Sequence, residues 1–417
     1  MRGVFGFLIV SLMYAPAAAQ TPAPRVPLAD LVNEALANNP EIAAARKQYD
    51  AALQRPTEAH SLPDPMLEAG YTSSGNPLPG AGLGTEPIAN IGFMVSQALP
   101  YPGKRGLDGA IATRGADADQ QQIEAVRLSV TARVKAAYYG LASTYAIGDV
   151  LTRNRDLLQT LLKVSENRYA AGLAAQQDVI RAQTELSVLE LRLERIGQER
   201  RTRQGELNAL LDRPAGRAIG RPDDLQLTPF ALSLDTLVTE ANAHAPVLRR
   251  DKILIDQSQL QVEAARKAYK PDFTLSGGYA SMGSMPPMFE VRFSVTIPVQ
   301  RARRAAAVAE QLDSVESARS AYNSARLDLQ SRLAGDFEQA STSQRLARLY
   351  HDTVLPQARL AFESSMASYQ TGTVDFLTVL TSFGTVLDYE TSYVDEVASF
   401  LAAMSRLEEL TGTPLVH

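Results

Sequence analysis

The chain has 417 residues, a net charge of −5 and no cysteine. The acidic balance argues against a nucleic-acid surface. The lack of cysteine excludes disulfides, thiolate metal sites and a lipid-modified cysteine. The four histidines are scattered, and the sequence contains no H-E-x-x-H, G-x-S-x-G or P-loop signature. We therefore expect no catalytic activity and no cofactor.

The first 19 residues predict a cleaved secretory signal. Arg2 provides the positive end, residues 4–13 the apolar core, and Ala17-Ala18-Ala19 a cleavage site before Gln20. A membrane anchor is the competing interpretation, but this apolar run is too short to span a bilayer. No later apolar run is long enough either, so we expect the mature chain to enter a membrane only as a β-barrel.

The first half, residues 20–211, begins with short helices over 28–38 and 41–62, the second broken at Pro56. Two strands follow at about 66–75 and 88–97, separated by a loop rich in glycine and proline. A proline-free helix is expected over about 103–171, roughly 100 Å long at 1.5 Å per residue. A return helix over about 176–211 completes the half, and residues 212–233 form a connector.

The same order then repeats over residues 234–412. Leu28-x-x-Leu31-Val32-x-Glu34-Ala35 reappears from Leu234, and Tyr169-x-x-Gly172 reappears at Tyr369. The second half is expected to contain strands at about 272–281 and 288–298, a long helix over about 301–371 and a return helix over about 375–411. Pro356 predicts a kink in that long helix. A tail, 413–417, ends the chain.

The strands have one apolar face and one polar face. In the last of them Phe289, Val291, Phe293, Val295 and Ile297 alternate with Glu290, Arg292, Ser294 and Thr296. Ten such residues can cross a bilayer when tilted. Four strands are too few to close a barrel, so two chains (eight strands) or three (twelve) must combine. The polar face then lines a water-filled lumen, and the shorter helices stack end to end beside the long ones.

With these features the chain resembles the TolC family of outer-membrane efflux channels over nearly its whole mature length. The tip motifs that match are Arg168-Tyr169-x-x-Gly172-Leu173 with Asp178-Val179-Ile180, and Tyr369-x-x-Gly372-Thr373 with Val379-Leu380. The resemblance implies a mainly helical homotrimer with a twelve-stranded outer-membrane β-barrel and a periplasmic α-helical barrel. It also implies a periplasmic adaptor and an inner-membrane transporter of the RND type as partners.

A narrower resemblance points to the heavy-metal efflux branch of this family. It rests on Leu62-Pro63-Asp64-Pro65-Met66-Leu67 and on Tyr101-Pro102-Gly103-Lys104-Arg105. Many members of that branch carry a lipidated N-terminal cysteine, which this chain lacks. Multidrug or solute efflux and type I secretion are alternatives within the same architecture. A secreted structural coiled-coil protein is the alternative from a different class.

The helix-hairpin tips are the expected gate and adaptor-docking region. The resemblance places family acids of the constriction at Thr378 and Thr381, where this chain has none, and Asp375 is either a substitute or a helix cap. It also implies a tip link between Asp178 and Tyr369. Arg168, Gly172, Leu173, Gly372 and Thr373 are the expected docking residues, and the glycines also fit helix termination.

Three methionines, Met282, Met285 and Met288, surround the second strand loop. Because thioethers favour soft ions such as Cu(I), they are candidate metal contacts. The alternative is that they are ordinary loop or lipid-contact residues.

Overall fold

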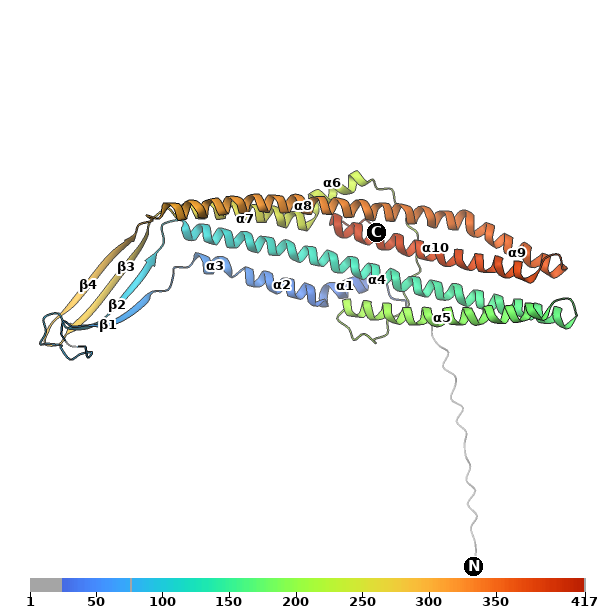
Figure 1. Ribbon diagram of the computed structural model, residues 1–417, viewed down its shortest axis with the longest axis horizontal. Helices are drawn as coiled ribbons and strands as arrows, with labels where there is room; N and C mark the ends of the chain where they lie inside the picture. Colours follow the sequence, from blue (N-terminus) through green and yellow to red (C-terminus); the bar gives the residue numbers. More distant parts are fainter. Residues whose placement is uncertain (1–24, 76, 416–417) are drawn as a thin grey trace, which may run out of the picture.

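The computed structural model describes residues 25–75 and 77–415. The expected signal peptide lies outside the described residues. The molecule is a long rod with the four strands at one end and two helical hairpins at the other (Figure 1). None of the described helices is both long and apolar enough to cross a membrane.

The first half contains α1 (Leu28–Asn38), α2 (Pro40–Ala52), α3 (Arg55–His60), β1 (Met66–Thr72), β2 (Asn90–Leu99), α4 (Lys104–Ala170) and α5 (Gln176–Leu210). The helical break lies at residues 53–54, so Pro56 falls in the first turn of α3, where its missing N–H has no partner to lose. β1 ends at Thr72, earlier than the sequence predicted. Beyond it, Ser73 and Ser74 donate to the Glu86 carboxylate instead of continuing the ladder.

The second half contains α6 (Leu234–His244), α7 (Pro246–Lys267), β3 (Asp272–Met282), β4 (Met285–Thr296), α8 (Arg301–Leu349), the π-helical turn η1 (Tyr350–Val354), α9 (Leu355–Thr371) and α10 (Phe376–Thr411). The single long helix expected here is therefore interrupted. Pro356 lies in the first turn of α9, directly after the wider turn of η1, and has no N–H with which to continue the α-helical hydrogen bonds.

The strands form one antiparallel sheet in the order β1-β2-β3-β4. β2 and β3 pair directly, with Phe93 opposite Tyr279, so the sheet joins the two halves of the chain. β4 begins at Met285, before the expected start, and pairs with Met282 across a tight turn. It ends at Thr296 because Pro298 has no N–H to donate to a ladder.

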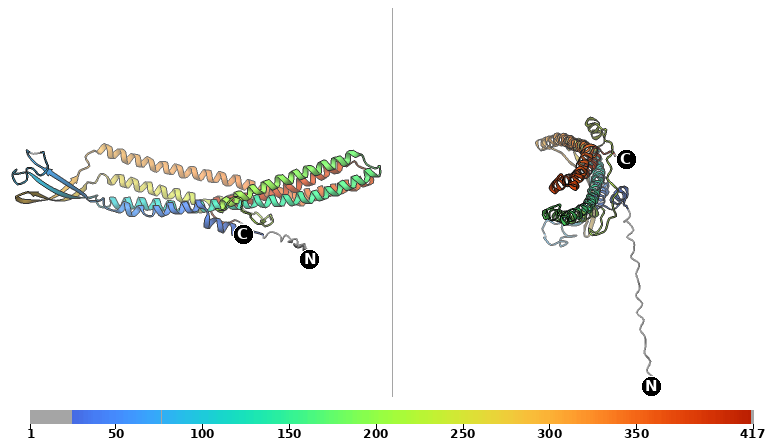
Figure 2. Two further views of the ribbon diagram at one scale, coloured as in Figure 1. Left: turned by 90° about the horizontal axis from the view of Figure 1, so that it is seen from below. Right: turned by 90° about the vertical axis from the view of Figure 1, so that its right-hand side faces the viewer.

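The shorter helices lie in line beside the long ones. α3, α2 and α5 follow one another along α4, and α7 and α10 follow one another along α8 and α9 (Figure 1). The layer is curved when it is viewed along its axis (Figure 2). Because α4 packs against α5, α7 and α10, it carries most of the contact between the halves.

Candidate functional site

The two helical hairpins end side by side, and both end in the same way. Gly172 and Gly372 have φ angles of 71° and 78°, in the left-handed region that favours glycine. Leu173 N donates to Arg168 O at 2.8 Å, and Thr373 N donates to Ser368 O at 2.9 Å. These are the bonds of a Schellman motif, which satisfies the last carbonyls of α4 and α9.

Arg168 connects the two hairpin ends. Its Nη1 donates to Gln370 O, near the end of α9, at 2.6 Å. Its guanidinium also lies 4.8 Å from the centre of the Tyr369 ring, a cation–π contact. The resemblance made Arg168 an expected contact of the adaptor. The structure places it mainly on the carbonyl of the other hairpin, with a weaker contact to Leu173 O at 3.4 Å.

Asp178 and Tyr369 do not meet within the chain. Tyr369 is 3% exposed and its ring packs against Phe376 at 5.3 Å between centroids. Among the described residues its hydroxyl has no hydrogen-bond partner. Asp178 lies instead in the first turn of α5, where a carboxylate is favoured by the helix N-terminus. The expected link is thus not formed inside one subunit, because the tyrosine points into the core of its own hairpin.

Asp375 caps α10. Its Oδ1 accepts hydrogen bonds from the Thr378 hydroxyl at 2.6 Å and from the Thr378 amide at 2.9 Å. These two bonds lower the pKa of the Asp375 carboxyl below its usual value. The amide and the hydroxyl of Thr378 thus both belong to the helix cap. The hydroxyl of Thr381 donates to Leu377 O, within the same helix, at 2.9 Å. Asp375 is exposed, so a carboxylate is still available at the tip.

One face of the sheet is apolar and exposed. Phe289, Val291 and Phe293 of β4 are 76%, 82% and 63% exposed. Aromatic rings from neighbouring strands pack together along this face. The ring centroids of Tyr279 and Phe289, for example, lie 5.4 Å apart. Such an extended apolar surface needs an apolar environment. β2, β3 and β4, with 10, 11 and 12 residues, are long enough to cross a bilayer when tilted.

The opposite face is concave and mostly small or polar, with Ser276 only 7% exposed. It is hollowed by about 260 Å³ beside Glu68, Met94, Met288 and Glu290. The strand register places Met282 and Met285 opposite each other on this same face. No group of three or more histidine, aspartate and glutamate side chains within the described residues is arranged to hold a metal ion.

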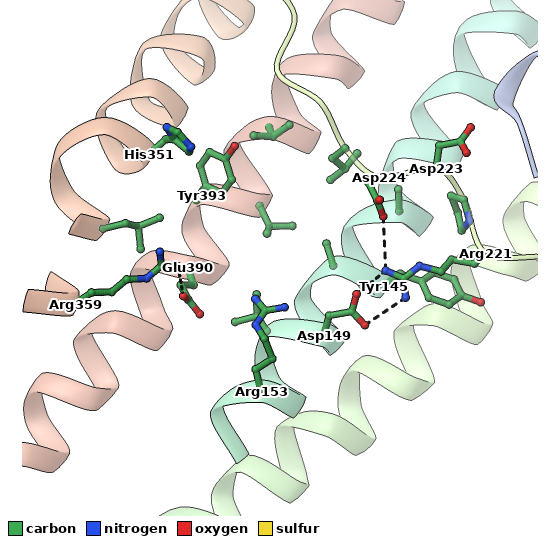
Figure 3. Close-up of a pocket in the computed structure, with 18 residues that line it drawn as sticks. Tyr145, Asp149, Arg153, Arg221, Asp223, Asp224, His351, Arg359, Glu390 and Tyr393 are labelled. Carbon is green, nitrogen blue, oxygen red and sulfur yellow. Dashed lines mark hydrogen bonds and ion pairs between the residues drawn. The ribbon is translucent and has the colours of Figure 1, made fainter. Parts of the chain in front are cut away.

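A cavity of about 410 Å³ lies midway along the rod and was not foreseen from the sequence (Figure 3). It is lined by residues of α4, α10, η1 and the connector. The sequence of the connector has no helical or strand periodicity, so the path of the connector could not be predicted. Most of its charges are paired: Arg221 donates to Asp149 at 2.5 Å, and Arg359 donates to Glu390 at 2.5 Å. His351 reaches the cavity from the π-helical turn.

The described residues thus combine a sheet with one exposed apolar face and a long, curved layer of helices that ends in two hairpins. The family model "Outer membrane efflux protein" matches residues 31–213 and 237–413, the two halves found in the sequence. The chain belongs to this family. It is therefore an outer-membrane channel that extends into the periplasm and is not an enzyme. Channels of this family assemble as trimers within tripartite pumps, with a twelve-stranded barrel and a helical tunnel.

Several individual proteins are similar to the chain. The cobalt-zinc-cadmium resistance protein CzcC of Cupriavidus metallidurans is 20% identical over 379 residues, 91% of this chain and 88% of that protein. The multidrug resistance outer membrane protein MdtP of Shigella flexneri is 26% identical, but over 55% of this chain and 54% of its own length. The crystal structure of CusC superimposes with a TM-score of 0.79 at 15% identity, covering 96% of both chains.

Proposed function

We propose that this channel is the exit duct for heavy-metal ions. The observation that carries the proposal is the match to the cobalt-zinc-cadmium resistance protein, which extends over nearly the full length of both chains. The match to the multidrug protein spans about half of each chain, although its local identity is higher. The strand-flanking sequences around Pro63-Asp64-Pro65 and Tyr101-Pro102-Gly103 support the same cargo class.

The partners of the channel would dock at the hairpin tips. Leu173 supports this placement because it is an apolar side chain 67% exposed at the tip of the α4–α5 hairpin. Gly172, Gly372 and Thr373 give both tips one backbone shape, to which one adaptor surface could fit in each half. The adaptor would connect the channel to an inner-membrane transporter of the RND type, which selects the cargo.

The test is a susceptibility panel on a deletion strain and its complemented twin. Copper, silver, zinc, cobalt, cadmium and nickel salts are compared with dyes, detergents and antibiotics. We expect the deletion to sensitise cells to one or a few metals only, with growth restored by the complementing copy. Broad sensitivity to drugs without sensitivity to any metal would show instead that the channel serves drug export, the alternative supported by the multidrug relative.

A further inference from the structure

The methionines of this chain are gathered on the concave face of the sheet. The sequence contains nine methionines, and five of them, Met66, Met94, Met282, Met285 and Met288, lie in the four strands. The register places all five on the face of Ser276. Ser276 pairs with Ser96, and Ser96 pairs with Met66. Met94 pairs with Gly278. Ala280 pairs with Met288, and Met282 with Met285.

The β4 bulge is what brings Met285 to this face, which Met288 already shares with Glu290 by simple alternation along β4. Between its pairs with Ala280 and Met282, β3 advances by two residues while β4 advances by three. Without that extra residue, Met285 and Met288 would point to opposite faces, because side chains alternate along a strand. The apolar face of β4 has phenylalanine and valine instead, so hydrophobicity alone does not account for methionine on the concave side.

Two of these thioethers share the hollow with two carboxylates. Met94, Met288, Glu68 and Glu290 all line the space of about 260 Å³. Between the two methionines the strands carry only Gly278 and Ala280, so no large side chain separates them. Gly92 is also required there, because a Cβ at that position would lie 2.4 Å from Tyr279 O.

The charges around the hollow are negative on balance. Glu290 pairs with Arg292, the next residue along β4 on the same face. Glu68 has no ion-pair partner among the described residues. A carboxylate that is not neutralised attracts cations to the lumen, and thioethers then select the softer ones.

We propose that this hollow is a transit site for a soft monovalent cation, Cu(I) or Ag(I), held by the sulfurs of Met94 and Met288 and attracted by Glu68 and Glu290. Met282 and Met285 form the next contact toward the β3–β4 turn. The site has no thiolate or imidazole, the ligands that bind zinc most strongly, so it discriminates against zinc. Weak, successive binding is what conduction requires, since an ion must also leave. This inference rests on the proposed metal cargo and specifies its class.

The direct test is silver binding to the purified full-length trimer in detergent. Because the chain has no cysteine, no thiolate competes for silver. With ¹³C-methyl methionine labels, we expect saturable shifts of the Met94 and Met288 signals on addition of silver nitrate. The signal of Met366, which lies in α9, serves as the internal control. The variant with both Met94→Leu and Met288→Leu should weaken binding about tenfold or more, whereas Met366→Leu should leave it unchanged.

Three results would overturn the site. These are no saturable shift at millimolar silver, an equal shift of Met366, or unchanged affinity in the double variant. Glu68→Gln should weaken silver binding without altering the methionine resonances of the free trimer. An unchanged affinity in Glu68→Gln would remove the carboxylate from the site.

A cellular comparison separates this inference from the proposed function. If the deletion strain is insensitive to every metal, the cargo proposal fails, whatever the purified trimer binds. If the deletion strain is metal-sensitive but the double variant restores silver and copper resistance fully, the cargo proposal stands and the transit site fails. We expect partial restoration for copper and silver and full restoration for zinc and cobalt.

Discussion

Arg168 is the residue through which the two hairpin ends act on each other. It belongs to α4, yet its 2.6 Å hydrogen bond reaches Gln370 at the end of α9. A hydrogen bond from a charged donor contributes about 1.5–3 kcal/mol when it is well protected, and about 1 kcal/mol is reasonable at this partly exposed position. Separation of the tips must break it.

We therefore expect Arg168→Ala to make the channel open more readily. Loss of about 1 kcal/mol raises the population of a minor open state roughly fivefold. The measurement is single-channel recording of the purified trimer in planar lipid bilayers. Arg168→Lys is the matched control, because it keeps the charge but loses the planar group that stacks on Tyr369. Equal open fractions in wild type and both variants would rule out a latch at this position.

The Asp375 cap gives a prediction that depends on pH. The pKa of this carboxyl is lowered, chiefly by the Thr378 hydroxyl and then by the Thr378 amide. Because the pKa is lowered in the folded state, the cap stabilises the helix fully at any pH above the usual carboxyl pKa. This stabilisation is lost as the pH falls through the pKa of the folded state. Asp375→Ala should therefore speed hydrogen exchange of the Thr378 amide at neutral pH, with the difference from wild type disappearing in acid.

Asp375→Asn distinguishes a cap from a charged ring. Asparagine caps helices about as well as aspartate, so exchange at Thr378 should stay slow. The three carboxylates of a trimer would be removed, however, so any cation selectivity that they confer should fall. If Asp375→Asn exchanges as fast as Asp375→Ala, the hydrogen bonds seen here do not stabilise the helix start.

At the scale of single residues, the sequence repeat predicted which residues occupy equivalent positions in the two hairpins, but not how deeply each of them is buried. The repeat makes Tyr169 and Tyr369 equivalent, yet Tyr169 is 47% exposed and Tyr369 is 3% exposed. Arg168 covers Tyr369 and no equivalent arginine exists in the second half, where Ser368 takes its place. Periodicity cannot report such a difference, because it arises from how two hairpins pack after each has folded.

At the scale of elements, two arginines explain an interruption in the apolar seam of α5. Arg200 lies over the Tyr145 ring at 4.2 Å, and its Nη2 comes so close to Gly148 that a Cβ there would lie 2.7 Å away. Arg203 lies beside Gly140, where a Cβ would make ordinary contact at 3.7 Å. The glycines of α4 thus face the arginines of α5.

This pairing predicts opposite outcomes for two equivalent substitutions. Alanine in place of glycine within a helix stabilises by about 1 kcal/mol when there is space. Gly140→Ala should raise the melting temperature of the trimer by a few degrees. Gly148→Ala should not, because it displaces the Arg200 guanidinium from Tyr145 and loses a cation–π contact of about 0.5–1 kcal/mol. Thermal unfolding of the two variants beside wild type is the measurement, and an equal rise in both would contradict the role of Arg200.

At the scale of the whole molecule, the rod shape could be predicted from the lengths and the order of the segments in the sequence. A proline-free stretch long enough for α4, two amphipathic strands per half and a tandem repeat leave little choice of architecture. The cavity beside η1 could not be derived in this way. It depends on the path of an irregular connector and on where a π-helical turn arises before Pro356. The trimer likewise came from family resemblance, because four strands alone allow two or three chains.

Two lysine substitutions on β4 test the orientation of the sheet in the assembled channel. Val291 is 82% exposed and pairs with Gly277, so Val291→Lys removes little packing within the chain. If that face meets lipid, a lysine near the middle of the bilayer costs about 2–4 kcal/mol in each of three subunits. Ser294 lies on the other face, opposite Thr274, and Ser294→Lys points into water.

We expect Val291→Lys to reduce the heat-modifiable trimer in outer-membrane fractions sharply, and Ser294→Lys to leave it near wild type. Equal yields would mean that the apolar face of the sheet does not meet lipid in the assembled channel.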